Sequence, residues 1–230
     1  VTKSPDAGRT RQALREATMA SHDRVDALFA DFSLDNARDY ADFLSAHSRA
    51  LSALEPAAQP DQARMPFLAQ DLAALGVAPP QSLSLESEGG DGYRWGLLYA
   101  LEGSRLGGAF LARRVGPGLP SAYLSATHDK GEWLAFQRAL DGAAAEGGEG
   151  WLNDAVQGAL AAFARRCHHV MTVRCGTVAR EFCVDFCIPG EGVIQRLDNQ
   201  YRTTAGNHEA VPIDIEGARG FVRRVVEAPR

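Results

Sequence analysis

Hydrophobic side chains in the first 170 residues recur at intervals of three and four positions, the spacing of one face of an α-helix. In the first such segment, residues 9–29, this face carries Leu14, Ala17, Ser21, Val25 and Leu28. The same spacing predicts helices over residues 39–54, in a shorter segment ending near residue 75, and over residues 93–115, 131–145 and 151–170. Pro56 is expected to end the second of these helices. Strand-like alternation is absent from this part of the sequence, which therefore predicts an all-α fold.

The last sixty residues follow a different pattern. Apolar side chains alternate with others at Phe182, Val184, Phe186 and Ile188, and again at Val211, Ile213 and Ile215. Such alternation is typical of strands. We therefore predict a helical domain over residues 1–170 and a C-terminal extension over residues 171–230, whose structure and role the pattern leaves open.

Composition narrows the possible classes of protein. The 230 residues are 45% hydrophobic and carry a net charge of −5, as in an ordinary globular protein. Phosphate contacts need a basic surface, so nucleic-acid binding is not expected. The sequence has no apolar run of about 18 residues and no signal-peptide core, so we expect no membrane partner and a cytoplasmic location. The four cysteines, all after residue 166, form no standard zinc pattern.

The first group with chemical potential lies in the first predicted helix. Arg15, Thr18, His22 and Asp26 are spaced three and four residues apart, so they share one stripe of that helix. A carboxylate one turn after a histidine can accept the N–H of one ring nitrogen and leave the other nitrogen for a metal. His22 is therefore a candidate iron ligand. A surface histidine that makes an ordinary helical hydrogen bond remains the alternative.

The second group is a run of glycines inside the long apolar helix. Each interior glycine costs about 0.5–1 kcal/mol relative to alanine. Gly103 and Gly107 are four residues apart and remove side chains from one face, and Gly108 widens the bare patch. Such a helix suits either a flat ligand or the close approach of another helix. Ser104 and Arg105 are polar groups that could lie beside a ligand.

These two groups, in this order, resemble two helices of the haem oxygenases. Arg15-Glu-Ala-Thr18 with His22 resembles the proximal helix of that family, and Glu102-Gly-Ser-Arg-Leu-Gly-Gly108 resembles the distal helix. The form with Glu-Gly-Ser and Leu-Gly is closest to the bacterial enzymes, including those paired with bacteriophytochromes. The similarity covers roughly residues 9–170. It implies a multi-helix bundle with haem between the first helix and the glycine-containing helix.

The resemblance also implies roles for individual residues. His22 matches the axial iron ligand, Arg15 matches a basic residue that meets a haem propionate, and Asp26 replaces a carboxylate, commonly Glu, beside that ligand. The glycines match those that let the distal helix lie over the macrocycle. Ser104 stands where animal enzymes have an aspartate that organises distal water, so Ser104 and Arg105 are predicted to hold that water. With Thr18, the predicted cofactor-binding set is Arg15, Thr18, His22, Asp26, Gly103, Ser104, Gly107 and Gly108.

The implied activity is oxidative cleavage of haem to biliverdin, CO and ferrous iron. Haem would be both cofactor and substrate, with dioxygen and external electrons consumed. The implied partners are an electron donor, such as ferredoxin or an NADPH-dependent reductase, and a bacteriophytochrome that receives biliverdin. A non-catalytic haem- or bilin-binding protein or sensor on the same scaffold is the alternative. A di-iron carboxylate protein is not expected, since no Glu is followed by a His three residues later.

Overall fold

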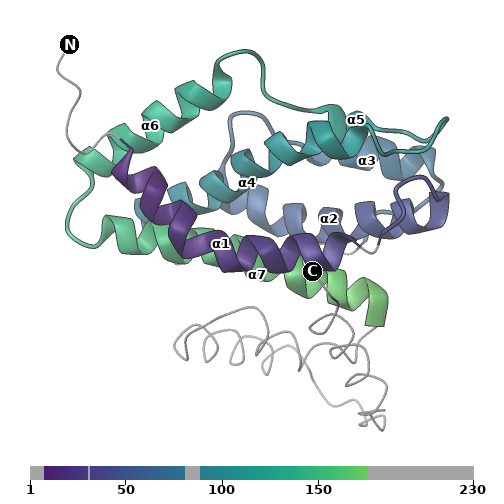
Figure 1. Ribbon diagram of the computed structural model, residues 1–230, viewed down its shortest axis with the longest axis horizontal. Helices are drawn as coiled ribbons and strands as arrows, with labels where there is room; N and C mark the ends of the chain where they lie inside the picture. The colour runs from purple at the N-terminus through teal and green to yellow at the C-terminus, as the bar shows by residue number, and fades with distance from the viewer. Residues whose placement is uncertain (1–7, 31, 81–88, 176–230) are drawn as a thin grey trace, which may run out of the picture.

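The computed structural model describes residues 8–30, 32–80 and 89–175 (Figure 1). Every helix or strand within these ranges is an α-helix, so the predicted all-α fold is confirmed for this part of the chain. The helices are α1 (Arg9–Ala30), α2 (Ala37–Ala58), α3 (Met65–Ala74), α4 (Asp91–Ala112), α5 (Ala122–Ser125), α6 (Glu132–Glu146) and α7 (Trp151–Cys175). The strands predicted over residues 182–188 and 211–215 lie outside the described residues.

Most helix bounds agree with the hydrophobic pattern, and α2 shows one clear difference. The expectation that Pro56 ends this helix was wrong, because α2 continues to Ala58. A proline removes only its own N–H, and Pro56 lies in the last turn, where few helical hydrogen bonds remain to be lost. The chain leaves the helix at Gln59, which is left-handed with φ 52° and donates its N–H to Glu55 O at 2.8 Å. Helix α7 continues beyond its predicted end at residue 170, as far as Cys175.

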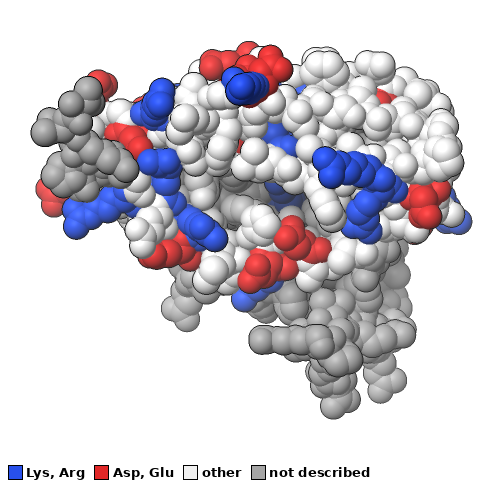
Figure 2. Space-filling model, turned by 45° about the horizontal axis from the view of Figure 1, so that its top comes forward, with Lys and Arg blue, Asp and Glu red and all other residues white. Residues whose placement is uncertain are grey.

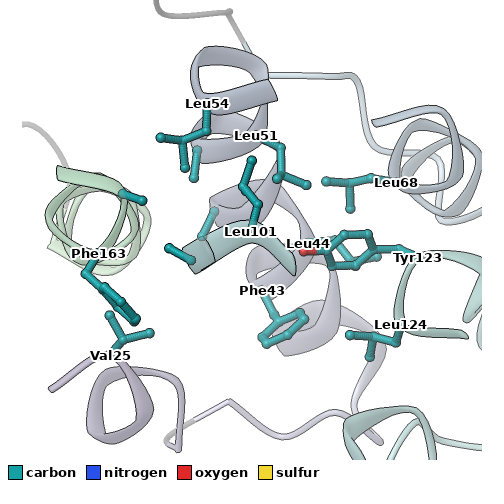
Figure 3. Packing of buried hydrophobic residues seen from close by; sticks show 14 of the residues in the cluster. Val25, Phe43, Leu44, Leu51, Leu54, Leu68, Leu101, Tyr123, Leu124 and Phe163 are labelled. Carbon is teal, nitrogen blue, oxygen red and sulfur yellow. The ribbon is translucent and has the colours of Figure 1, made fainter. Parts of the chain in front are cut away.

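Helix α7 is the centre of the bundle, since α1, α2 and α4 all pack against it. Helix α6 packs against α1 and α4, and α5 lies against α3 and α4 (Figure 1). Apolar side chains from six of these helices form the main core. They include Val25, Phe43, Leu44, Leu51, Leu54, Leu68, Leu101, Tyr123, Leu124 and Phe163 (Figure 3). Because α1 and α4 both contact α7, this helix fixes their relative positions.

The crossing of α4 and α7 depends on glycines in the first half of α4. A Cβ added to Gly92 would lie 2.5 Å from Trp151 O. A Cβ at Gly96 would collide with Ala155 O, and one at Gly158 of α7 would collide with Tyr93 O. These glycines therefore let the two helix backbones touch. None of the described helices is both long enough and apolar enough to cross a lipid bilayer.

Candidate functional site

One side of α1 presents His22 to solvent. Its side chain is 60% exposed, and its Nδ1 lies 3.2 Å from Oδ2 of Asp26, one turn later. A carboxylate beside Nδ1 favours the tautomer with the proton on that nitrogen, which leaves Nε2 unprotonated and able to bind a metal. Arg15 and Met19 are exposed on the same side of the helix, Met19 by 60%. Thr18 is buried instead, and its hydroxyl donates to Leu14 O at 2.7 Å.

The second half of α4 has an open face of small and apolar residues, formed by Gly103, Leu106, Gly107 and Phe110. A Cβ added to Gly103 or Gly107 would meet no atom within 4 Å. Leu106 is 51% exposed and Phe110 is 65% exposed, although both are large hydrophobic residues. A bare, apolar helix face of this kind is suited to a flat hydrophobic ligand. We call these four residues the glycine face.

Gly108 does not belong to the glycine face. It is buried, and a Cβ added to it would lie 2.9 Å from the backbone oxygen of Leu124 in α5. The glycine run therefore serves both of the purposes weighed from the sequence. Gly108 allows close packing with α5, whereas Gly103 and Gly107 leave space open.

Tyr99 links the glycine face to α1. It lies four residues before Gly103, so it extends the same face of α4 by one turn. Burial raises the pKa of Tyr99, and the positive charge of Arg15 acts in the opposite direction. Tyr99 packs against the core cluster that contains Leu14, the residue before Arg15 in α1. The sequence interpretation missed Tyr99, although its spacing from Gly103 was a usable signal. An Arg and a Tyr at one end of an apolar face can bind the carboxylates of an amphipathic ligand.

The molecular surface supports such a ligand. The face on which α6 and the segment after α5 lie above α1 is hollowed near its middle (Figure 2). Basic side chains are visible within and beside this hollow, and acidic side chains lie along its lower edge (Figure 2). The combination suits a large apolar molecule with anionic groups.

Ser104 lies on the flank of α4, and its hydroxyl is fully used. It donates to Leu101 O at 2.6 Å and accepts from Nη2 of Arg64 at 2.8 Å and Nη2 of Arg166 at 2.9 Å. A hydroxyl has one donor and two acceptor positions, so these three bonds complete its capacity. In this arrangement Ser104 orders two buried guanidinium groups rather than water. Arg64 was not singled out from the sequence.

Arg105 points to the side of α4 opposite the glycine face. It is 4% exposed, donates to Gln62 O at 2.7 Å, and its Nε lies 3.5 Å from Glu102 Oε2. The same Glu102 oxygen accepts from His128 Nε2 at 2.7 Å. The structure thus places Arg105 in a buried ion-pair group behind α4, and does not bring it together with His22.

We expect Arg105→Met to destabilise the fold. The change removes the bond to Gln62 O and leaves the partly buried Glu102 with only His128 as a partner, so the free energy of unfolding should fall by about 2–4 kcal/mol. Urea unfolding measures this. Arg94→Met is the matched control, because Arg94 lies on the same helix and its ion pair with Asp91 is partly exposed. That control should change stability by about 0–1 kcal/mol. Equal effects of the two substitutions would contradict the assignment.

His47 is a neutral histidine packed among aromatic rings. Its ring centroid lies 4.5 Å from that of Phe29, 4.3 Å from Phe43 and 5.5 Å from Tyr123. Its Nδ1 donates to Phe43 O at 3.0 Å. Burial lowers the pKa of His47 from 6.5 to about 3, and the positive charge of Arg166 adds to this effect.

This shift predicts a pH dependence of stability. Below its ordinary pKa of 6.5 His47 takes up a proton in the unfolded chain, but in the folded chain it does so only near its pKa of about 3. Stability is therefore lost as the pH falls through this window, with a slope of up to about 1.4 kcal/mol per pH unit. The variant His47→Leu should show a flatter dependence in urea unfolding between about pH 7 and pH 5. Parallel curves for parent and variant would contradict the shift.

An open groove of about 630 Å³ lies beyond the other end of α4. Its lining includes Asp91, Trp95, Glu146 and Trp151. The carboxylate of Asp91 already accepts from Trp151 Nε1 at 3.1 Å and from Arg94 Nη2 at 3.0 Å. The groove contains neither His22 nor the glycine face, so we do not assign the site to it.

Comparisons with known proteins identify related chains. No family model matches this sequence. An alignment of 117 positions, which covers 44% of this chain, shows 38% identity to a haem oxygenase of Xanthomonas campestris pv. campestris (strain 8004), and this chain matches only 63% of that relative's length. The fold is similar to that of the NO- and CO-bound haem oxygenase of Neisseria meningitidis, with a TM-score of 0.62 and 28% identity over 71% of this chain and 91% of the other. The resemblance to bacterial haem oxygenases inferred from the sequence is confirmed.

Proposed function

We propose that this protein, whose sequence and fold resemble those of bacterial haem oxygenases, cleaves haem to biliverdin, CO and ferrous iron. One observation carries the proposal. The structure combines an exposed His22, whose Nδ1 is held by Asp26, with an open glycine face on α4. The first supplies a nitrogen ligand for iron, and the second supplies a surface against which a flat macrocycle can lie.

The residues present fit haem. Nε2 of His22 is the nitrogen that would bind iron, because Asp26 engages the other one. Gly103 and Gly107 would let the macrocycle approach the α4 backbone, since neither glycine has a neighbour where a Cβ would stand. The exposed Met19, Leu106 and Phe110 would cover its apolar surface, and Arg15 with Tyr99 would bind a propionate. The proposal explains why these three large hydrophobic side chains are exposed in the ligand-free protein, since bound haem would cover them.

The protein's contribution to the reaction is position and electrostatics. Haem, when bound, supplies the iron that activates dioxygen and the macrocycle that is oxidised. The carboxylate of Asp26 beside Nδ1 of His22 favours the tautomer that leaves Nε2 for iron. An imidazole nitrogen would donate less electron density to iron than a thiolate does. With haem in place, the side chains of Phe110 and Leu106 would exclude bulk water from the site. The open space at Gly103 and Gly107 would admit a small diatomic substrate.

The reaction needs external electrons. We propose an electron donor such as ferredoxin or an NADPH-dependent reductase, and a bacteriophytochrome as an acceptor of biliverdin. Both follow from the resemblance to bacterial haem oxygenases, and both are testable by mixing the proteins.

Absorption spectra of the purified protein with hemin test the function. We expect a saturable one-to-one complex with a shifted Soret band, followed by loss of that band and growth of biliverdin absorption when a reductant is added in air. A complex that keeps its Soret band through repeated reduction would favour the non-catalytic haem-binding alternative. The filled hydrogen-bonding capacity of Ser104 makes that alternative worth testing. Absence of hemin binding would overturn both.

A further inference from the structure

The imidazole of His22 contacts two groups on different helices. Asp26 belongs to the same helix, one turn later. Phe163 belongs to α7, and its ring centroid lies 5.9 Å from that of His22 with the ring planes inclined by 56°. A tilted contact at this distance is a favourable aromatic geometry. Residues 141 positions apart in the chain therefore meet at the candidate iron ligand.

The ion-pair contact with Asp26 does not orient the imidazole by itself. It restrains the imidazole only along the line that joins Nδ1 to the carboxylate, so the ring can still move about χ1 and χ2 together with the Asp26 side chain. Asp26 is also 68% exposed, so water competes for its oxygen atoms. A second contact, away from that line, is needed to fix the direction in which Nε2 points.

Phe163 is well placed to supply this contact. It is 6% exposed and belongs to the main core. Its ring points towards Val25 of α1, one turn after His22 on the buried side of that helix (Figure 3). A core side chain has few rotamers available, because its neighbours are close-packed. Phe163 thus extends the rigidity of the core to an otherwise exposed histidine.

We propose that Phe163 is a positioning residue for His22, which it holds in one orientation for iron ligation. This inference rests on the proposed function, since it concerns the ligand that His22 provides. It adds a residue of α7 to a site otherwise formed by α1 and α4. It also explains why an exposed histidine can act as a directional ligand without a surrounding cage of polar groups.

The test substitutes Phe163→Leu, which keeps an apolar core side chain but removes the ring. Phe43→Leu is the matched control, because Phe43 is also a core aromatic, and its ring contacts are with Phe29, Phe32, Tyr40 and His47. Nitrogen-15 NMR of the ligand-free protein reports the protonation pattern and mobility of the His22 ring. Resonance Raman spectra of the ferrous haem complex report the iron–histidine stretching band.

We expect Phe163→Leu to mobilise the His22 ring in the ligand-free protein, to broaden or shift the iron–histidine band, and to weaken hemin binding roughly two- to tenfold. Phe43→Leu should leave all three readouts as in the parent. If Phe163→Leu does not fold, Phe163→Met keeps more of the volume and serves instead. Unchanged readouts in a folded Phe163 variant, or equal changes in the Phe43 control, would overturn the inference. A parent protein that binds no hemin through His22 would instead overturn the proposed function.

Discussion

His22→Ala should abolish biliverdin formation and the iron–histidine band of the haem complex, while leaving the ligand-free fold unchanged. The side chain is 60% exposed, so its loss creates no cavity in the core. Alanine also has the higher helix propensity, which offsets the lost contacts with Asp26 and Phe163 by a few tenths of a kcal/mol. The measurements are absorption and resonance Raman spectra with hemin, biliverdin yield after reduction, and thermal unfolding of the ligand-free protein.

Two further variants provide comparisons for the effect of His22→Ala on haem binding and turnover. Asp26→Asn keeps the ligand but removes the negative charge beside Nδ1 that favours its tautomer, so hemin affinity or turnover should fall by about tenfold or more. Asp23→Ala changes an exposed neighbour of His22 and should have little effect on either. A His22→Ala protein that makes biliverdin at the parental rate, with the parental spectrum, would show that another residue binds iron.

Gly107→Leu should block haem binding without harming the fold. Nothing lies within 4 Å of a Cβ at this position, so the leucine enters space that the protein itself does not use. Stability of the ligand-free protein should be unchanged, or should rise by up to about 0.8–1 kcal/mol through helix propensity. In the proposed complex the same leucine occupies the volume of the macrocycle, so hemin affinity should fall steeply. Thermal unfolding and a hemin titration on the same samples measure the two effects.

Gly108→Ala is the matched control, because the adjacent glycine has the opposite environment. Its new Cβ would lie 2.9 Å from Leu124 O, so α5 or α4 must shift. We expect a loss of about 1–3 kcal/mol in the ligand-free protein. The two substitutions should therefore have different effects: Gly107→Leu should reduce haem binding, and Gly108→Ala should reduce stability. If Gly107→Leu destabilises the ligand-free protein and retains haem binding, the assignment of the glycine face fails.

The helices could be predicted from the sequence because helical periodicity is a local property. Spacings of three and four residues defined α1, α4, α6 and α7 to within a few residues at most ends, and the same rule placed His22 and Asp26 one turn apart. Pro56 shows the limit of such rules. A proline's local preference predicts where a helix tends to end, but hydrogen bonds in the final turn decide the actual residue.

The contacts of the side chains on the flanks of α4 could not be predicted in this way, since their partners lie in distant parts of the chain. Ser104 and Arg105 were predicted beside the ligand, but Arg64 and Arg166 occupy the Ser104 hydroxyl, and Arg105 pairs with groups behind the helix. Tyr99 became a candidate site residue only in the structure, where the charge of Arg15 on another helix acts on the pKa of its phenol.

The sequence by itself thus determined which residues share a face of one helix, because neighbours three and four apart are set by the helix alone. Only the tertiary structure decided what each face meets. Gly107 and Gly108 are identical and adjacent in sequence, yet one faces open space and the other packs against Leu124. Successive residues of an α-helix point about 100° apart. Gly108 therefore points towards α5, which packs on α4, while Gly107 points away from it. Phe163 reaches His22 for the same reason, because α7 packs against α1.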